Sequence, residues 1–169
     1  DSCAANKNLV KSVQSRVTKL REIRVAMGDV INAIVSPGDT VSALDYLMVI
    51  QDAATAGLNL GDAELKESLS NLTQNAPKAK YDGVIDRIEV YYNGEISDMS
   101  ESLAAVVKAS DSELVKRAKA SGNTPHKGRV TDNYRTGGKS LSEGNCIIKV
   151  YIEVVSRLGN SDKIVCAHQ

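Results

Sequence analysis

Basic side chains supply the first candidate chemistry in this sequence, and many of them gather in a turn-rich loop between residues 126 and 139. The loop carries Lys127, Arg129, Arg135 and Lys139, with Asp132 as its one acidic residue. Lysine and arginine neutralise phosphates, so such a loop can contact a nucleic-acid backbone without reading its sequence. The simpler alternative is a solvated loop without a ligand. The sequence leaves both interpretations open.

A second basic stretch lies near the N-terminus. Its apolar residues come close to helical spacing, which predicts a basic amphipathic helix within residues 1–28; they are Leu9, Val13, Val17, Leu20 and Ile23. The basic residues of the stretch are Lys7, Lys11, Arg16, Lys19, Arg21 and Arg24, against the single acid Glu22. Such a helix can follow phosphates, or its charges can simply face solvent.

The third candidate is Lys163, which follows Asp162 in a turn between two apolar, strand-like segments. A lysine on a turn between strands is a rigidly placed point charge that can hold a phosphate. The alternative is a surface lysine paired with Asp162. His168 follows closely, and an isolated histidine more commonly makes structural hydrogen bonds.

Metal and redox chemistry have less support. Cys3, Cys146 and Cys166 lie far apart without the close pairing of zinc ligands, so we expect no metal site and reduced thiols in a cytoplasm. The apolar runs are too short to span a bilayer. The chain begins at Asp1 and ends at Gln169 directly after a strand-like stretch, which favours a fragment or a processed product.

The elements that must position these residues predict an α+β fold. The sequence has 42% apolar residues but no Phe or Trp, so the core must be aliphatic, and its 21 basic and 21 acidic residues balance. We expect four segments: the basic helix (1–28), a β-rich unit with a helical insertion at about 53–75 (29–93), a helical pair (94–122) and a β segment (123–169). In the helical pair, the first helix follows Asp98, and a capping box at Ser110 and Glu113 starts the second.

The β-rich unit resembles a barrel-sandwich hybrid. Two β-rich runs meet at the turn Pro37-Gly38-Asp39, and the segment Asp82-Gly83-Val84-Ile85 begins a later strand. The same fold serves lipoyl and biotinyl carriers, in which a lysine sits on a tight hairpin. Lys78 and Lys80 lie outside any tight hairpin, so the sequence argues against the carrier interpretation.

Residues 147–169 carry a more specific resemblance. The segment resembles a strand-turn-strand of the β-type large subunit of multisubunit DNA-dependent RNA polymerases, and residues 81–135 resemble the divergent split subunits of giant phages. The matching positions of the first segment are Ile148, Lys149, Val150, Tyr151, Arg157, Asp162, Lys163 and His168. Ser161 stands where that family has glycine, and the chain ends before the family's second lysine.

The resemblance implies a C-terminal hairpin from an incomplete double-psi β-barrel beside the polymerase active centre. Lys163 and His168 would contact RNA or nucleotide phosphates. The catalytic Mg²⁺ would come from a β′-type partner subunit, because this chain lacks the Asp-Phe-Asp-Gly-Asp motif. Other polymerase subunits, template DNA and RNA would be the partners, in the host cytoplasm, and the isolated chain would not catalyse.

Two other hypotheses remain. The chain could be a non-enzymatic binding or scaffold domain that uses a hybrid-barrel fold. A carrier or metabolic enzyme domain is the third, although the sequence offers no nucleophile–base pair, glycine-rich phosphate loop or metal cluster for it.

Overall fold

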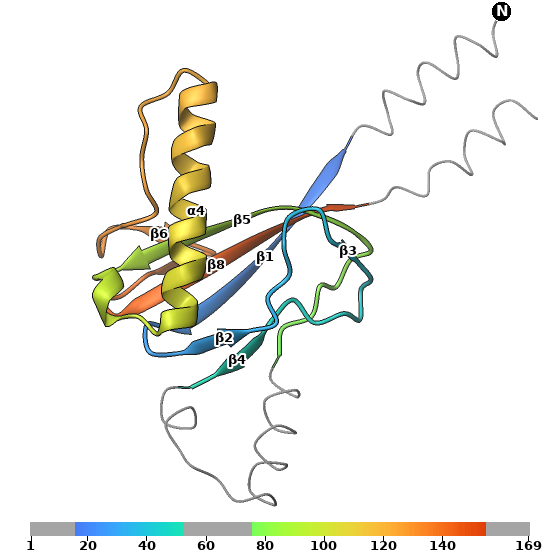
Figure 1. Cartoon of the computed structure of the whole chain (residues 1–169), viewed down its shortest axis with the longest axis horizontal. Coiled ribbons are helices and arrows are strands. Elements are labelled where there is room, and N and C mark those ends of the chain that lie inside the picture. The colour runs from blue at the N-terminus through green and yellow to red at the C-terminus, as the bar shows by residue number, and fades with distance from the viewer. Residues whose placement is uncertain (1–15, 53–75, 155–169) are drawn as a thin grey trace, which may run out of the picture.

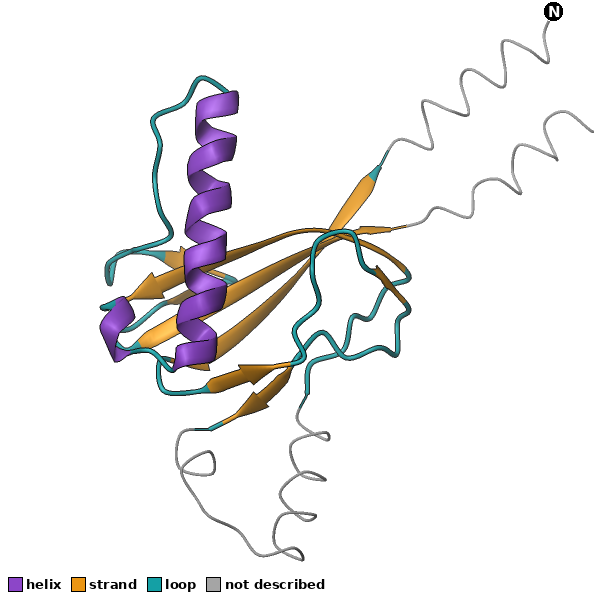
Figure 2. Cartoon of the chain, in the orientation of Figure 1, coloured by secondary structure: helices purple, strands orange, loops and turns teal. Residues whose placement is uncertain are grey.

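The computed structural model describes residues 16–52 and 76–154, which form antiparallel strands and one long helix (Figures 1 and 2). The main sheet has the order β1-β8-β5-β3 and curls like half of a barrel. Its strands are β1 (Val17–Ala26), β8 (Asn145–Val154), β5 (Gly83–Asn93) and β3 (Thr40–Val41). Two smaller antiparallel pairs join β2 (Val30–Asn32) with β4 (Val49–Gln51), and β6 (Arg135–Thr136) with β7 (Lys139–Ser140). The described residues therefore confirm a mixed α and β fold.

Strand β8 is the structural centre of the sheet. It pairs along its length with β1 on one side and with β5 on the other. Ile147, Ile148, Val150 and Ile152 are fully buried, and β-branched residues of this kind favour extended backbone. The strands predicted from Cys146 onward and within residues 81–92 are both confirmed.

Helix α4 (Glu101–Ala120) covers one face of this sheet. The helix begins after the 3-10 turn η1 (Ile96–Asp98), and its N-cap is Ser100, whose hydroxyl accepts a hydrogen bond from the backbone N–H of Leu103. The helix buries a stripe at helical spacing, formed by Leu103, Val107, Leu114 and Ala118. The predicted aliphatic core is confirmed, with Tyr92 as its one fully enclosed ring among the described residues.

The predicted N-terminal helix is wrong where the structure describes it, because β1 replaces it from Val17 onward. The buried residues Ile23 and Val25 follow a period of two and join the core beside Ile148 and Cys146. Pairing with β8 satisfies the backbone of this stretch, and this tertiary contact outweighs the near-helical spacing of Val17, Leu20 and Ile23.

The predicted helical pair is also wrong, since α4 runs without interruption from Glu101 to Ala120. Ser110 does not cap a second helix: its hydroxyl is buried and accepts a hydrogen bond from the backbone N–H of Val90, at 2.8 Å. Asp98, the predicted first cap, lies in η1. Ser110 therefore bonds β5 instead of starting a helix, and Glu113 is an exposed residue of α4 that pairs with Lys116.

Four strands, β2 to β5, lie where the β-rich unit was predicted. Pro37-Gly38-Asp39 forms the predicted turn, and Gly38 has a φ of +94°, which favours glycine. The runs on either side of this turn do not pair with each other, because β2 pairs with β4 while β3 pairs with β5. The predicted insertion at 53–75, the turn at 158–162 and the strand at 163–167 lie outside the described residues. No helix among the described residues is long and apolar enough to cross a membrane.

Candidate functional site

The two residues predicted to contact phosphates at the active centre, Lys163 and His168, lie outside the described residues. The strand that leads to them is described. In β8, Ile148 and Val150 point into the core, whereas Lys149 and Tyr151 lie on the opposite face of the sheet. The segment that carries the polymerase resemblance thus begins in the most firmly held strand of the fold.

The four basic residues predicted to bind a nucleic-acid backbone do not converge. Arg135 and Lys139 belong to the β6–β7 hairpin, which contacts the sheet face opposite α4. Arg135 donates a hydrogen bond to the carbonyl of Gly138, within the hairpin itself. Arg129 lies at the edge of β5, and Lys127 lies beside α4. The structure therefore divides the predicted basic loop into separate sites.

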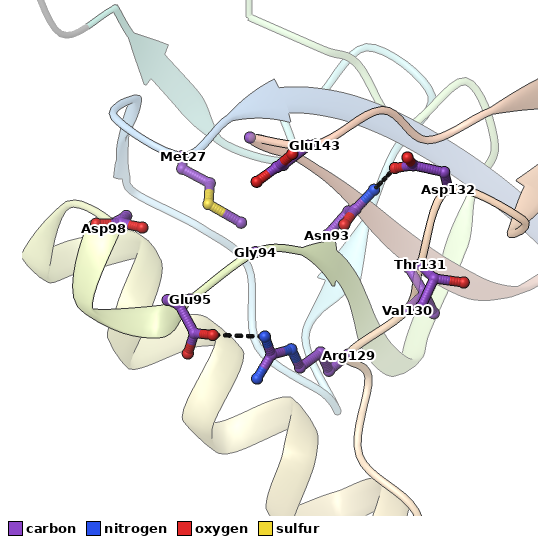
Figure 3. A pocket seen from close by; sticks show the side chains of 11 residues that line it. Met27, Asn93, Gly94, Glu95, Asp98, Arg129, Val130, Thr131, Asp132 and Glu143 are labelled. Atoms are coloured by element: carbon purple, nitrogen blue, oxygen red, sulfur yellow. Dashed lines mark hydrogen bonds and ion pairs between the residues drawn. The ribbon is translucent and has the colours of Figure 1, made fainter.

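Arg129 lines a pocket of about 430 Å³ at the end of β5 (Figure 3). Its guanidinium is paired with Glu95 across the pocket, and the amide of Asn93 donates a hydrogen bond of 2.6 Å to Asp132. Glu143 faces the same space. Arg129 therefore has a carboxylate partner within the fold, although both side chains are more than half exposed.

On the sheet face opposite α4, basic, acidic and aromatic side chains form a connected group that we call the sheet-face cluster. It comprises Glu22, Arg24, Asp86, Arg87, Glu89, Tyr91, Tyr134, Lys149 and Tyr151. Lys149 Nζ lies 3.8 Å from Glu22 and 5.0 Å from the centre of the Tyr91 ring. The Tyr91 and Tyr134 rings stack with their centres 5.3 Å apart. The three basic residues of the cluster are thus balanced by three acidic ones.

The hydrogen bonds of the sheet-face cluster stabilise the ionised form of Glu89 and the neutral form of Tyr91. Glu89 accepts hydrogen bonds from Arg87, at 2.7 Å, and from the hydroxyl of Tyr91, at 2.6 Å. Burial would raise the pKa of Glu89, but these two bonds and the nearby cations outweigh it and hold the pKa below its ordinary value. Burial and the bond to Glu89 raise the pKa of Tyr91 far above its usual range.

Lys149 keeps its charge for similar reasons. Burial would lower its pKa, but the hydroxyl of Tyr134 and the charge of Glu22 outweigh this effect and hold the pKa above its ordinary value. Both Lys149 and Tyr91 therefore stay protonated near neutral pH. The sheet-face cluster therefore holds the β6–β7 hairpin in place and does not suit acid–base catalysis.

On the outer side of α4, three lysines surround one surface depression of about 520 Å³, and we call them the lysine site: Lys108, Lys116 and Lys127. Two of them come from the helix and the third from the segment that returns after it. Ser112, Asp111 and the apolar residues Ile96 and Val115 also line the depression. Lys108, Ser112 and Lys116 are four residues apart, which places them in a row along one helical face.

Lys127 is held beside the helix by its neighbour Gly128. The backbone N–H of Gly128 donates to a carboxylate oxygen of Asp111, at 2.8 Å, and its carbonyl accepts from the backbone N–H of Tyr92. A Cβ at Gly128 would lie 1.9 Å from the carbonyl oxygen of Val90, so only glycine fits here. The second carboxylate oxygen of Asp111 accepts from the hydroxyl of Tyr92, at 2.8 Å.

Sequence reasoning included Lys127 and missed its two partners. The signal was the four-residue spacing of Lys108, Ser112 and Lys116, which is meaningful only on one continuous helix. A helix break predicted at Ser110 placed Lys108 and Lys116 on different elements. The pattern was present, but the wrong boundary concealed it.

Among the described residues, no three His, Cys, Asp or Glu side chains lie close enough to hold a metal ion. Cys146 is buried, and burial raises the pKa of its thiol to about 12, so it is a core residue and a poor nucleophile. Comparison with protein-family models, with curated proteins and with solved structures found no match to this chain.

Proposed function

We propose that this chain is part of a β-type large subunit of a multisubunit DNA-dependent RNA polymerase, most similar to the split subunits of giant phages. In this proposal it contributes phosphate contacts beside the active centre through Lys163, with His168 as a second contact. It works in the cytoplasm of the host, together with the other polymerase subunits, template DNA and RNA.

The position of β8 is the observation that supports this proposal best. Residues 148–151 carry part of the polymerase-like pattern, and they lie in the strand that is paired on both sides. Lys163 follows Val154, the last residue of β8, by nine positions. Opening β8 would break two hydrogen-bonded ladders at once, so the strand is a rigid point of attachment for the segment that carries Lys163. Phosphate contacts gain most from such rigid placement.

The chemistry of phosphoryl transfer explains why this chain and its β′-type partner would have different roles. The reaction depends mainly on positioning and on neutralising phosphate charge. A lysine ammonium is a compact point charge that suits the second task. The catalytic Mg²⁺ would be supplied by the β′-type partner, whose metal-binding motif this sequence lacks. This chain would bind and orient phosphates, and we expect no nucleotide transfer from the isolated 169-residue chain.

Substitution of Lys163 in the complete assembled enzyme tests the proposal. We expect Lys163→Ala to slow RNA synthesis about ten- to a hundredfold, which corresponds to the loss of one charge-assisted contact of about 1.5–3 kcal/mol. Lys163→Arg should restore only part of the rate, because a planar guanidinium fits a point-charge site poorly. The matched control is Lys80→Ala, which removes an exposed lysine outside the predicted nucleic-acid contacts and should leave the rate close to that of the parent. Equal rates for the parent and Lys163→Ala would contradict the assignment of this residue.

A further inference from the structure

The outer face of α4 carries an excess of positive charge in a chain whose formal net charge is zero. Between residues 108 and 129 there are six basic and two acidic residues. One of the acids, Asp111, is buried, and both of its oxygens accept hydrogen bonds from within the fold. Glu113 is thus the one exposed carboxylate of this range, and Glu95, outside the range, pairs with one of the six cations, Arg129. Figure 1 shows the C-terminal half of α4 extending past the sheet.

The helix dipole explains part of this charge but not the lysine site. Cations in a last helical turn compensate the partial negative charge there, and Arg117 and Lys119 have that position. Lys108 lies about three turns before the end of the helix, and Lys127 follows the helix in the sequence. The helix dipole therefore does not explain why Lys108, Lys116 and Lys127 line one depression.

Internal pairing does not explain the lysine site either. Across residues 16–52 and 76–154, the ammonium groups of Lys108 and Lys127 have no carboxylate within ion-pair distance. Lys116 lies 3.8 Å from Glu113, but both side chains are more than half exposed, so the pair contributes little. Asp111 also lines the depression, but both of its oxygens accept hydrogen bonds within the fold. Lys108 and Lys127 therefore present positive charge that no described carboxylate pairs with.

We propose that the lysine site binds the phosphate backbone of a nucleic acid, without sequence preference. Lys108 and Lys116 are about 12 Å apart along the helix axis, and Lys127 lies beside them. A row of that length suits successive phosphates better than one isolated phosphate. Ser112, between the two helical lysines, can donate a further hydrogen bond to a phosphate oxygen. The apolar lining residues Ile96 and Val115 can contact sugars.

The choice of nucleic acid over other polyanions rests on the proposed function, because DNA and RNA are the polyanions that a polymerase subunit meets. The binding itself requires only the geometry of the lysine site. The site also differs from Lys163 in its place in the sequence and in its role, since it would hold nucleic acid and not a reacting phosphate. The two assignments can therefore fail separately.

The test measures binding of a fluorescein-labelled single-stranded RNA of about 16 nucleotides to the full chain by fluorescence anisotropy. The lysine-site variant combines Lys108→Ala, Lys116→Ala and Lys127→Ala. We expect it to bind roughly tenfold or more weakly than the parent at low salt, and to lower the slope of log affinity against log salt by about 2, since each single-strand phosphate contact contributes about 0.7.

A matched control removes three exposed lysines outside the lysine site and outside the loop 126–139, through Lys19→Ala, Lys78→Ala and Lys80→Ala. This control should keep most of the affinity. Equal binding by the parent and the lysine-site variant would overturn the inference, and so would equal losses in the two triple variants. Lysine-dependent binding to phosphatidylserine vesicles or to polyglutamate, without binding to RNA, would overturn it in favour of a membrane or an acidic protein.

Transcription by the assembled enzyme separates this inference from the proposed function. If the lysine-site variant binds RNA as the parent does and Lys163→Ala slows synthesis strongly, the lysine site is not a nucleic-acid contact and the proposed polymerase function stands. If the lysine-site variant binds RNA more weakly and Lys163→Ala has no effect on synthesis, the lysine site is a nucleic-acid contact and Lys163 has no role at the active centre.

Discussion

Cations gather in two regions of this protein, and the two regions treat them in opposite ways. In the sheet-face cluster, the cations have acidic, carbonyl or aromatic partners. Arg87, for example, is bonded to Asp86 and Glu89, and its guanidinium lies 3.7 Å from the centre of the Tyr151 ring. In the lysine site, Lys108 and Lys127 point to solvent without such partners among the described residues.

The difference separates charge that the fold pairs internally from charge that it leaves available to a ligand. Paired, partly buried charges fix one element against another, and here they attach the β6–β7 hairpin to the sheet. Unpaired charges on a rigid helix contribute little to folding but raise the local potential, which attracts anions. The number of basic residues in a region is therefore a poor guide to binding. What matters is whether the fold has already neutralised them.

The largest expected effect concerns Asp111, which connects the lysine site to the core. Asp111→Ala would leave the hydroxyl of Tyr92 and the N–H of Gly128 without their acceptor in a buried place. We expect a loss of about 3 kcal/mol in the free energy of unfolding, measured by urea denaturation. Asp111→Asn keeps one acceptor oxygen and should lose clearly less. Equal losses for the two variants would show that the volume of the side chain matters and its hydrogen bonds do not.

An intermediate effect should appear as pH dependence of the sheet-face cluster. The pKa of Glu89 is lower in the folded protein than in the unfolded chain, so its ionised form stabilises the fold. This contribution is present above the unfolded value of about 4.3 and is lost as the pH falls through the folded pKa. We expect Glu89→Gln to be less stable than the parent at pH 7, and the difference to shrink in acid.

The control for this pH effect is Glu113→Gln, at an exposed carboxylate on α4. It should leave the acid dependence of stability close to that of the parent. A difference between parent and Glu89→Gln that stays constant from pH 7 into the acid range would show that Glu89 acts through packing alone.

The smallest effect on stability should come from the lysine site. Replacing Lys108, Lys116 and Lys127 by Ala removes exposed cations and improves helix propensity at two positions. The free energy of unfolding should therefore change by less than about 1 kcal/mol. Lys149→Ala, one cation from the sheet-face cluster, should cost more than all three together. The comparison between the two regions would be wrong if urea denaturation gave the reverse order.

The sequence predicted the strands with strong β-branched content, because Ile147, Ile148, Val150 and Ile152 allow few alternatives. It failed where the decisive contact is distant in the chain. The stretch that begins at Val17 has near-helical spacing, but it becomes a strand because β8 offers it an edge. Ser110 and Glu113 match a capping box, but Ser110 instead bonds Val90 across the helix–sheet interface.

The candidate site was predictable only in part, for the same reason. Lys127 was identified from its basic surroundings, whereas Arg135 and Lys139, from the same loop, lie on the opposite face of the sheet. No local pattern shows that Gly128 anchors the returning segment to Asp111 and so places Lys127 beside Lys108. That arrangement depends on the packing of α4 against β5, which spacing alone does not reveal.

The most direct test of the polymerase assignment is to locate the growing RNA end relative to this chain. A photoreactive nucleotide placed at the RNA 3′ end of a stalled, fully assembled elongation complex can be crosslinked, and the attached peptide mapped by mass spectrometry. The proposed function predicts crosslinks within residues 155–169, centred on Lys163 and reduced by Lys163→Ala. Crosslinks that reach only other subunits, with none in this segment, would contradict it.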